Sequence, residues 1–314
     1  MQKRFLQFCL VGAFVLQFLF YSTLPLCAQL SRTLTPSDTL NNIRLSSVTL
    51  LGSAAYGASV YGMYTLWYSG FGPEPFHFFN DNDEWLYMDK VGHLYSAYAL
   101  SSRGIDVMQW TGMDHKKAIL IGGLYGYLYQ TSIEVFDGFS PDWGFSWGDI
   151  VANTIGTSLA MFQELQYGKQ KFLVKWSFRE TEFAKYRPEL LGKNFNQQMF
   201  KDYNGQSYWI SVPLHELFHS ETRFPKWLCI SGGIGAEGML GGVGNPEKNE
   251  EGEELPHFER RQQYYFSLDI DLTAIPTQSR LLKTVFNLVN VLKVPMPALE
   301  YNRTDHFKFH SLYY

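Results

Sequence analysis

The sequence predicts an α+β protein, with an N-terminal, membrane-associated helical bundle followed by a strand-rich C-terminal domain. The first part contains long apolar runs that are nearly free of charge and have the length of helices. Beyond about residue 193 the apolar runs become short, aromatic or β-branched, and Gly, Pro and acidic turns separate them, as is typical of strands. We expect a signal peptide at 1–28, a linker at 29–43, a helical domain at 44–167, a connecting segment at 168–200 and a strand-rich domain at 201–314.

Composition and charge limit the class of protein. The chain has 314 residues, of which 46% are hydrophobic and 17% aromatic, so it can bury a sizeable core. Its formal net charge is only -4, and its basic residues are scattered apart from a stretch at 169–187. The positive surface that nucleic-acid binding requires is missing. We therefore expect no nucleic-acid partner.

The first 28 residues have the pattern of an export signal. A short basic start precedes an apolar run from Phe5 to Leu26, and cleavage near Ala28 fits the residues that follow. Lipid attachment at Cys27 is disfavoured, because lipoprotein signals carry a small residue where Leu26 stands. The alternative is an uncleaved anchor, since the run is long enough to span a bilayer. We expect an exported protein of the cell envelope, facing the periplasm at the outer or inner membrane.

Four helices are expected before residue 168. Residues 46–68 carry no charge, are rich in Gly, Ala, Ser and Tyr, and are long enough to span a membrane; the alternative is a buried core helix. Three more helices are expected at 88–103, 116–136 and 147–166. The acidic loop at 80–84 conflicts with the positive-inside rule if the signal is cleaved. Either the signal is retained, or the bundle lies in an outer membrane, or the first helix does not span.

Five strands and one amphipathic helix are expected in the C-terminal part. The strands are expected at 208–212, 227–233, 264–272, 298–301 and 307–314, and the helix at 280–291. The charge run at 247–254 is expected to be a solvated loop.

Charged and polar side chains interrupt the otherwise apolar helices at regular intervals. Asp89 and His93 are four residues apart, as are Asp149 and Asn153, so each pair shares a helix face. Placing charges in apolar surroundings costs desolvation free energy, which favours pairing of these side chains with one another and with Glu134 across the bundle. The candidate site residues are Asp89, His93, Glu134 and Asp149, supported by Lys90, Asp137, Ser146, Trp147, Asn153 and Gly156.

Three kinds of chemistry fit this set. The imidazole beside carboxylates can transfer protons, and carboxylates with an imidazole can bind a divalent cation. The third interpretation is a set of hydrogen bonds that only fixes the helices. We favour a structural or partner-binding and lipid-binding role, with membrane lipid as the expected partner and a protein of the envelope as another. The alternative is an envelope enzyme that acts on a lipid-linked substrate. Cofactor, metal and enzymatic status stay open.

The order of these residues resembles a known family. The pattern is Asp89-Lys90-x-x-His93, Glu134-x-x-Asp137, Gly144-x-Ser146-Trp147-x-Asp149 and Asn153-x-x-Gly156. It is similar to the YfiM-like family of predicted periplasmic lipoproteins, whose function is unknown, and more weakly to the VanZ-like membrane proteins. The resemblance covers about residues 85–165, and the rest resembles longer members from Bacteroidetes-type bacteria. It implies an envelope location and no particular reaction.

Two sharper motifs are less favoured. His215-Glu216-x-x-His219 matches the zinc-peptidase pattern, with Glu237, His257 or His306 as third ligand. Prolines at 213 and 225 leave little room for the helix that this motif needs. The Gly-rich run at 233–238 matches a dinucleotide fingerprint, but no helix is expected after it. We expect a glycine-rich strand there.

Overall fold

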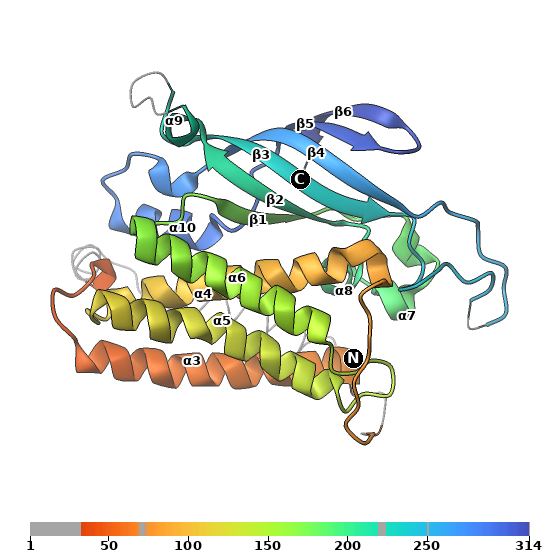
Figure 1. The fold of residues 1–314 in the computed structure, drawn as a ribbon, viewed down its shortest axis with the longest axis horizontal. Helices are drawn as coiled ribbons and strands as arrows, with labels where there is room; N and C mark the ends of the chain where they lie inside the picture. Colours follow the sequence, from red (N-terminus) through yellow and green to blue (C-terminus); the bar gives the residue numbers. More distant parts are fainter. Residues whose placement is uncertain (1–32, 69–71, 73, 219–223, 250, 314) are drawn as a thin grey trace.

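The computed structural model describes residues 33–313 apart from 69–71, 73, 219–223 and 250, and it confirms the α+β class. The expected signal peptide lies outside the described residues. The described helices α3 to α6 pack as a bundle, and a six-stranded sheet lies along one side of it, opposite α3 (Figure 1).

The bundle consists of four long helices close to the expected positions. They are α3 (Asn42–Met63), continued by a π-helical turn at Tyr64–Tyr68, α4 (Met88–Trp110), α5 (His115–Asp137) and α6 (Trp147–Tyr167). Asn41, Asp114 and Ser146 cap the N-termini of α3, α5 and α6 by accepting a hydrogen bond from a backbone N–H of the first turn. Sequence-local capping therefore fixes where three of the four helices begin.

Glycines allow the helices to approach α4 closely. A Cβ atom at Gly122 of α5 would lie 2.4 Å from the Gly104 carbonyl oxygen of α4, and one at Gly156 of α6 would lie 2.1 Å from the Leu94 carbonyl oxygen. Only a residue without a side chain fits at these crossings. Gly156, expected to support the site, therefore sets the distance between α4 and α6.

Within the described residues, no helix combines the length and the hydropathy needed to cross a membrane. This finding does not support the membrane span expected at 46–68. The alternative of a buried core helix is wrong, because none of the residues of α3 is buried.

The sheet is an antiparallel meander in the order β1-β2-β3-β4-β5-β6. Its strands are β1 (Leu173–Phe178), β2 (Gln206–Pro213), β3 (Leu228–Glu237), β4 (Arg261–Ile270), β5 (Met296–Asn302) and β6 (His306–Tyr313). The shorter helices are α7 (Pro188–Leu191), α8 (Phe195–Lys201), α9 (Leu214–Leu217) and α10 (Arg280–Val289). Strands β2 to β6 and helix α10 were expected. Strand β1 lies in the segment 168–200, which was expected only to connect the two parts. The glycine-rich run is strand in β3, as expected.

One face of the sheet joins the two parts of the protein. The pairing register places Trp176, Tyr208, Ile234 and Tyr264 in one row across β1 to β4. The Tyr95 ring of α4 packs on this row, with its centroid 6.4 Å from that of Trp176 and 5.7 Å from that of Tyr208. The start of α4 is therefore fixed against β1 and β2, whereas Tyr264 on the same face is exposed.

The opposite face of the sheet is buried but polar. Lys175 Nζ lies 3.1 Å from Asp269 Oδ2, and both side chains are fully buried. Ser207 of β2 and Tyr313 of β6 approach to 3.0 Å through their hydroxyl oxygens. This face thus buries ionic and hydroxyl groups beside a core cluster of Trp209, Tyr265, Ala298 and Tyr313.

Candidate functional site

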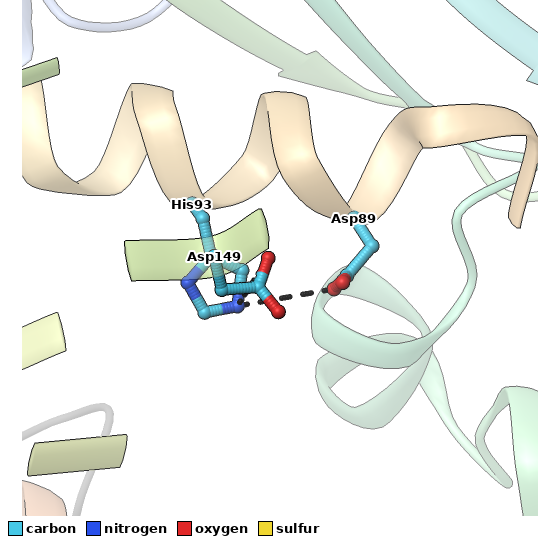
Figure 2. Close-up of side chains that lie close together, drawn as sticks. All are labelled: Asp89, His93 and Asp149. Atoms are coloured by element: carbon cyan, nitrogen blue, oxygen red, sulfur yellow. Dashed lines mark ion pairs between the residues drawn. The ribbon is translucent and has the colours of Figure 1, made fainter. Parts of the chain in front are cut away.

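The four candidate site residues converge at the end of the bundle where α4 and α6 begin and α5 ends. We call Asp89, His93, Glu134 and Asp149 the polar cluster. His93 Nε2 lies 3.6 Å from Glu134 Oε1, 3.8 Å from Asp149 Oδ1 and 3.9 Å from Asp89 Oδ1. Figure 2 shows Asp89, His93 and Asp149 pointing toward one another. The structure therefore brings together four residues that the sequence separates by up to 60 positions.

The other ring nitrogen of His93 is held by neighbouring amides. His93 Nδ1 lies 3.3 Å from Asn153 Oδ1 and 3.4 Å from Gln130 Nε2. A proton on Nδ1 that is donated to Asn153 leaves the Nε2 lone pair of a neutral ring facing the three carboxylates. Gln130 was missed by the sequence analysis. It stands four residues before Glu134 on α5, and this spacing on one helix face was a signal that could have identified it.

Lys90 bridges three carboxylates beside the polar cluster. Its Nζ lies 2.7 Å from Asp81, 2.9 Å from Asp89 and 2.9 Å from Asp149. Asp81 belongs to the acidic loop and was missed, because nothing in the local sequence shows that this loop folds back onto α4. Lys90 was expected as a supporting residue, and the structure places it as the ammonium group that the carboxylates share.

Ser146 ties the loop, α5 and α6 together. Its hydroxyl donates to Asp81 at 2.6 Å and accepts from the backbone N–H of Asp149 at 3.2 Å. Its own backbone N–H donates to Glu134 Oε2 at 3.2 Å. One serine therefore caps α6 and also orients two carboxylates around the site.

Tyr203 reaches the polar cluster from the strand-rich part. Its hydroxyl donates to Asp89 Oδ1 at 2.5 Å. It lies between α8 and β2, so a contact across 114 positions completes the surroundings of Asp89. A local sequence pattern cannot reveal such a contact.

Two expected supporting residues lie beside the polar cluster rather than in it. Asp137 accepts a hydrogen bond from the Tyr68 hydroxyl. Trp147 is 64% exposed and stacks on Phe78, with ring centroids 6.1 Å apart.

Burial and mutual charge perturb the protonation of the cluster. Burial raises the pKa of Glu134 to about 8. Burial alone would lower the pKa of His93, but the charges of Asp149, Asp89 and Glu134 outweigh it and raise that pKa to about 9. Burial alone would raise the pKa of Asp89, but the charges of His93 and Lys90 outweigh it and lower that pKa. The cluster thus takes up protons when no other cation balances its carboxylates.

Three buried polar atoms in the site lack a hydrogen-bond partner among the described residues. They are Glu134 Oε1, Asn153 Nδ2 and Asp149 Oδ1, and the Glu134 side chain is only 1% exposed. Asp149 Oδ1 keeps an ion pair with Lys90 at 2.9 Å, whereas Glu134 Oε1 has only the 3.6 Å contact with His93. An unsatisfied buried group costs roughly 1–3 kcal/mol. Three atoms, one each from Asp89, His93 and Asp149, lie within 4.8 Å of one another and are placed to hold a metal ion.

The zinc-peptidase motif does not form a comparable group in the described part of the chain. Helix α9 is a single turn, and Glu216 is paired with Lys169 at 2.5 Å and Lys171 at 2.9 Å. His219 lies outside the described residues. Glu237, one of the residues considered as third zinc ligand, forms ion pairs with Arg179 and Arg261.

Comparison with known proteins finds a family match over part of the chain. Residues 77–165 match the family described as predicted periplasmic lipoprotein (DUF2279). This segment contains the whole polar cluster. The description is consistent with the exported, cell-envelope location expected from the sequence. No curated protein and no solved structure matches the chain.

Proposed function

We propose that the protein works at a membrane surface of the cell envelope, with apolar side chains on its outside in contact with lipid. The observation that carries this proposal is the exposure of large apolar side chains along the bundle. On α5, Leu120, Leu124 and Leu128 follow one another at intervals of four residues, and all are exposed. On α6, Val151 and Ile155 repeat the pattern. Exposed apolar stripes of this kind are typical of surfaces that bind a membrane or a partner.

An aromatic cluster adjoins the polar cluster and supports lipid rather than protein as the partner. It consists of Phe76, Phe78, Phe139, Phe145 and Trp147, whose rings are in contact. Phe78 and Phe145 are joined by a β-bridge, which holds the two loops together. Phe78 is 61% exposed and Trp147 is 64% exposed. Aromatic side chains favour the boundary between lipid headgroups and acyl chains.

A second candidate function is an envelope enzyme acting on a lipid-linked substrate at the polar cluster, by hydrolysis or transfer. Glu134 Oε1, which is buried without a hydrogen bond, favours it over a purely structural role, because a set that only fixed the helices would give this oxygen a donor. Ser146 holds Glu134 while its neighbours Phe145 and Trp147 belong to the aromatic cluster. A lipid bound at those rings would therefore present its polar part to the carboxylates.

Vesicle flotation tests the lipid proposal. The chain from Gln29, without the apolar start, is mixed with vesicles of equal parts zwitterionic and anionic phospholipid, and the floating fraction is measured. Phe78→Ser should weaken binding about tenfold, because inserting one aromatic side chain contributes roughly 1.5 kcal/mol. The matched control is Phe200→Ser on α8, since Phe200 is similarly exposed and lies outside the aromatic cluster. Failure of the wild type to float, or equal loss in both variants, would refute the proposal.

A further inference from the structure

We infer that Asp89, His93, Glu134 and Asp149 bind one divalent transition-metal ion. The inference deepens the second candidate function by naming what its site holds, and it is independent of lipid contact. It stands on the distances within the polar cluster, the unpaired oxygen of Glu134, the balance of charges and the contacts that hold each ligand.

The spacing of the polar cluster suits an ion better than direct hydrogen bonds. His93 Nε2 lies 3.6–3.9 Å from an oxygen of each of the three carboxylates. These separations exceed a normal hydrogen bond. Ligand atoms about 2.1 Å from a tetrahedral ion lie about 3.4 Å from one another, and those around a larger coordination sphere spread further. Atoms of Asp89, His93 and Asp149 thus lie within 4.8 Å of one another around a space of the size of an ion, and Glu134 Oε1 lies beside His93 at 3.6 Å from Nε2.

The unpaired oxygen of Glu134 is a second and independent observation. Oε1 is buried, has no donor among the described residues and points at His93 Nε2, whereas Oε2 is occupied by the Ser146 backbone N–H. A cation at the centre would satisfy Oε1. Among the described residues it has only the 3.6 Å contact with His93 Nε2, which is too long for a hydrogen bond.

The charges of the site leave room for a divalent cation. Four carboxylates meet here, from Asp81, Asp89, Glu134 and Asp149, and Lys90 supplies one ammonium charge. With a neutral imidazole the sum is three negative charges, and a divalent ion would reduce it to one. Buried carboxylates in such excess require compensation by a proton or a metal.

Contacts around the ligands hold them in place, as is common at metal sites. His93 Nδ1 lies 3.3 Å from Asn153 Oδ1, and a proton on Nδ1 donated to Asn153 would leave Nε2 as the ligand atom facing the centre. Lys90 holds Asp89 through Oδ2 and Asp149 through both carboxylate oxygens. An imidazole with three carboxylates favours zinc, manganese or iron(II), because calcium and magnesium prefer oxygen ligands alone.

The test is the metal content of the purified chain, measured by mass spectrometry, followed by chelation and titration with Zn²⁺ or Mn²⁺ in a calorimeter. Wild type should bind about one equivalent with a rise in melting temperature, and His93→Gln should bind at least tenfold more weakly. The matched control is His215→Gln, which should bind as wild type, because His215 lies in α9 beside Glu216. If His93→Gln does not fold, Asp149→Asn replaces it with the same expectation.

Two outcomes would overturn the inference. One is a wild type that folds and takes up neither Zn²⁺ nor Mn²⁺. The other is loss of the metal from His215→Gln with full retention in His93→Gln, which would place the ion at the zinc-peptidase motif. Neither outcome bears on vesicle flotation, so failure of the metal site and failure of lipid contact are distinguishable.

Discussion

Replacement of Glu134 by Gln should stabilise the metal-free protein at neutral pH. Burial raises the pKa of Glu134 from 4.5 to about 8, so the folded state favours the protonated acid whereas the unfolded chain favours the carboxylate. Each pH unit between the two pKa values corresponds to about 1.4 kcal/mol. At pH 7 the native carboxyl therefore lowers the free energy of unfolding by up to roughly 3 kcal/mol, which a neutral amide of the same shape avoids. The pKa of about 8 already includes the attraction of His93, so we expect a gain of up to about 3 kcal/mol.

The stabilisation by Glu134→Gln should depend on pH. Because the folded pKa is the higher one, the destabilisation by Glu134 is absent below pH 4.5, grows as the pH rises and is complete above pH 8. The gain from Glu134→Gln should follow this course in thermal unfolding with EDTA at pH 5, 7 and 8. The matched control is Glu216→Gln, because hydrogen bonds from Lys169 and Lys171 lower the pKa of Glu216 to about 2. That variant should lose stability instead. If Glu134→Gln is as destabilising as the control at pH 7, Glu134 is a paired carboxylate and the reasoning is wrong.

Two further predictions concern the frame around the site. Lys90→Met should destabilise the protein by roughly 3–5 kcal/mol in thermal unfolding, because it leaves buried carboxylates without their shared cation. Lys185→Met, which removes an exposed ion pair, should have little effect on the same measurement. Equal losses of stability in the two variants would contradict the argument. Gly156→Ala should destabilise by roughly 2 kcal/mol or more, because the added carbon would lie 2.1 Å from the Leu94 carbonyl oxygen. Gly52→Ala, with nothing within 4 Å, should be neutral or mildly stabilising in the same unfolding measurement, and a tolerated Gly156→Ala would show that the helices can separate.

The helices and the polar cluster were predictable because their signals are local. Long apolar runs with few charges predict the helices, and polar residues three or four positions apart identify the face on which they meet. His93 and Asp149 could be paired from the sequence because an isolated charge on an apolar helix requires a partner. The division at residues 44–167 and 201–314 stays a prediction.

Strand β1 carries a local signal that the sequence analysis missed, because Val174, Trp176 and Phe178 alternate with Lys175 and Ser177 as in a half-buried strand. What the sequence does not show is that the polar residues Lys175 and Ser177 are buried. Asp81 and Tyr203 were missed for a different reason. Each reaches the polar cluster from a loop, and its role depends on a fold that only the complete chain defines.

Because the Tyr203 hydroxyl donates a hydrogen bond to Asp89, both the helical part and the strand-rich part of the chain contribute residues to the site. The family match ends at residue 165, so it contains every carboxylate and the imidazole but not this phenol. A fragment limited to the matched segment would carry the signature of the family and still leave Asp89 short of one donor. In this chain the loop that leads into β2 is therefore part of the environment of Asp89, and any shift of this loop against α4 changes the surroundings of that acid.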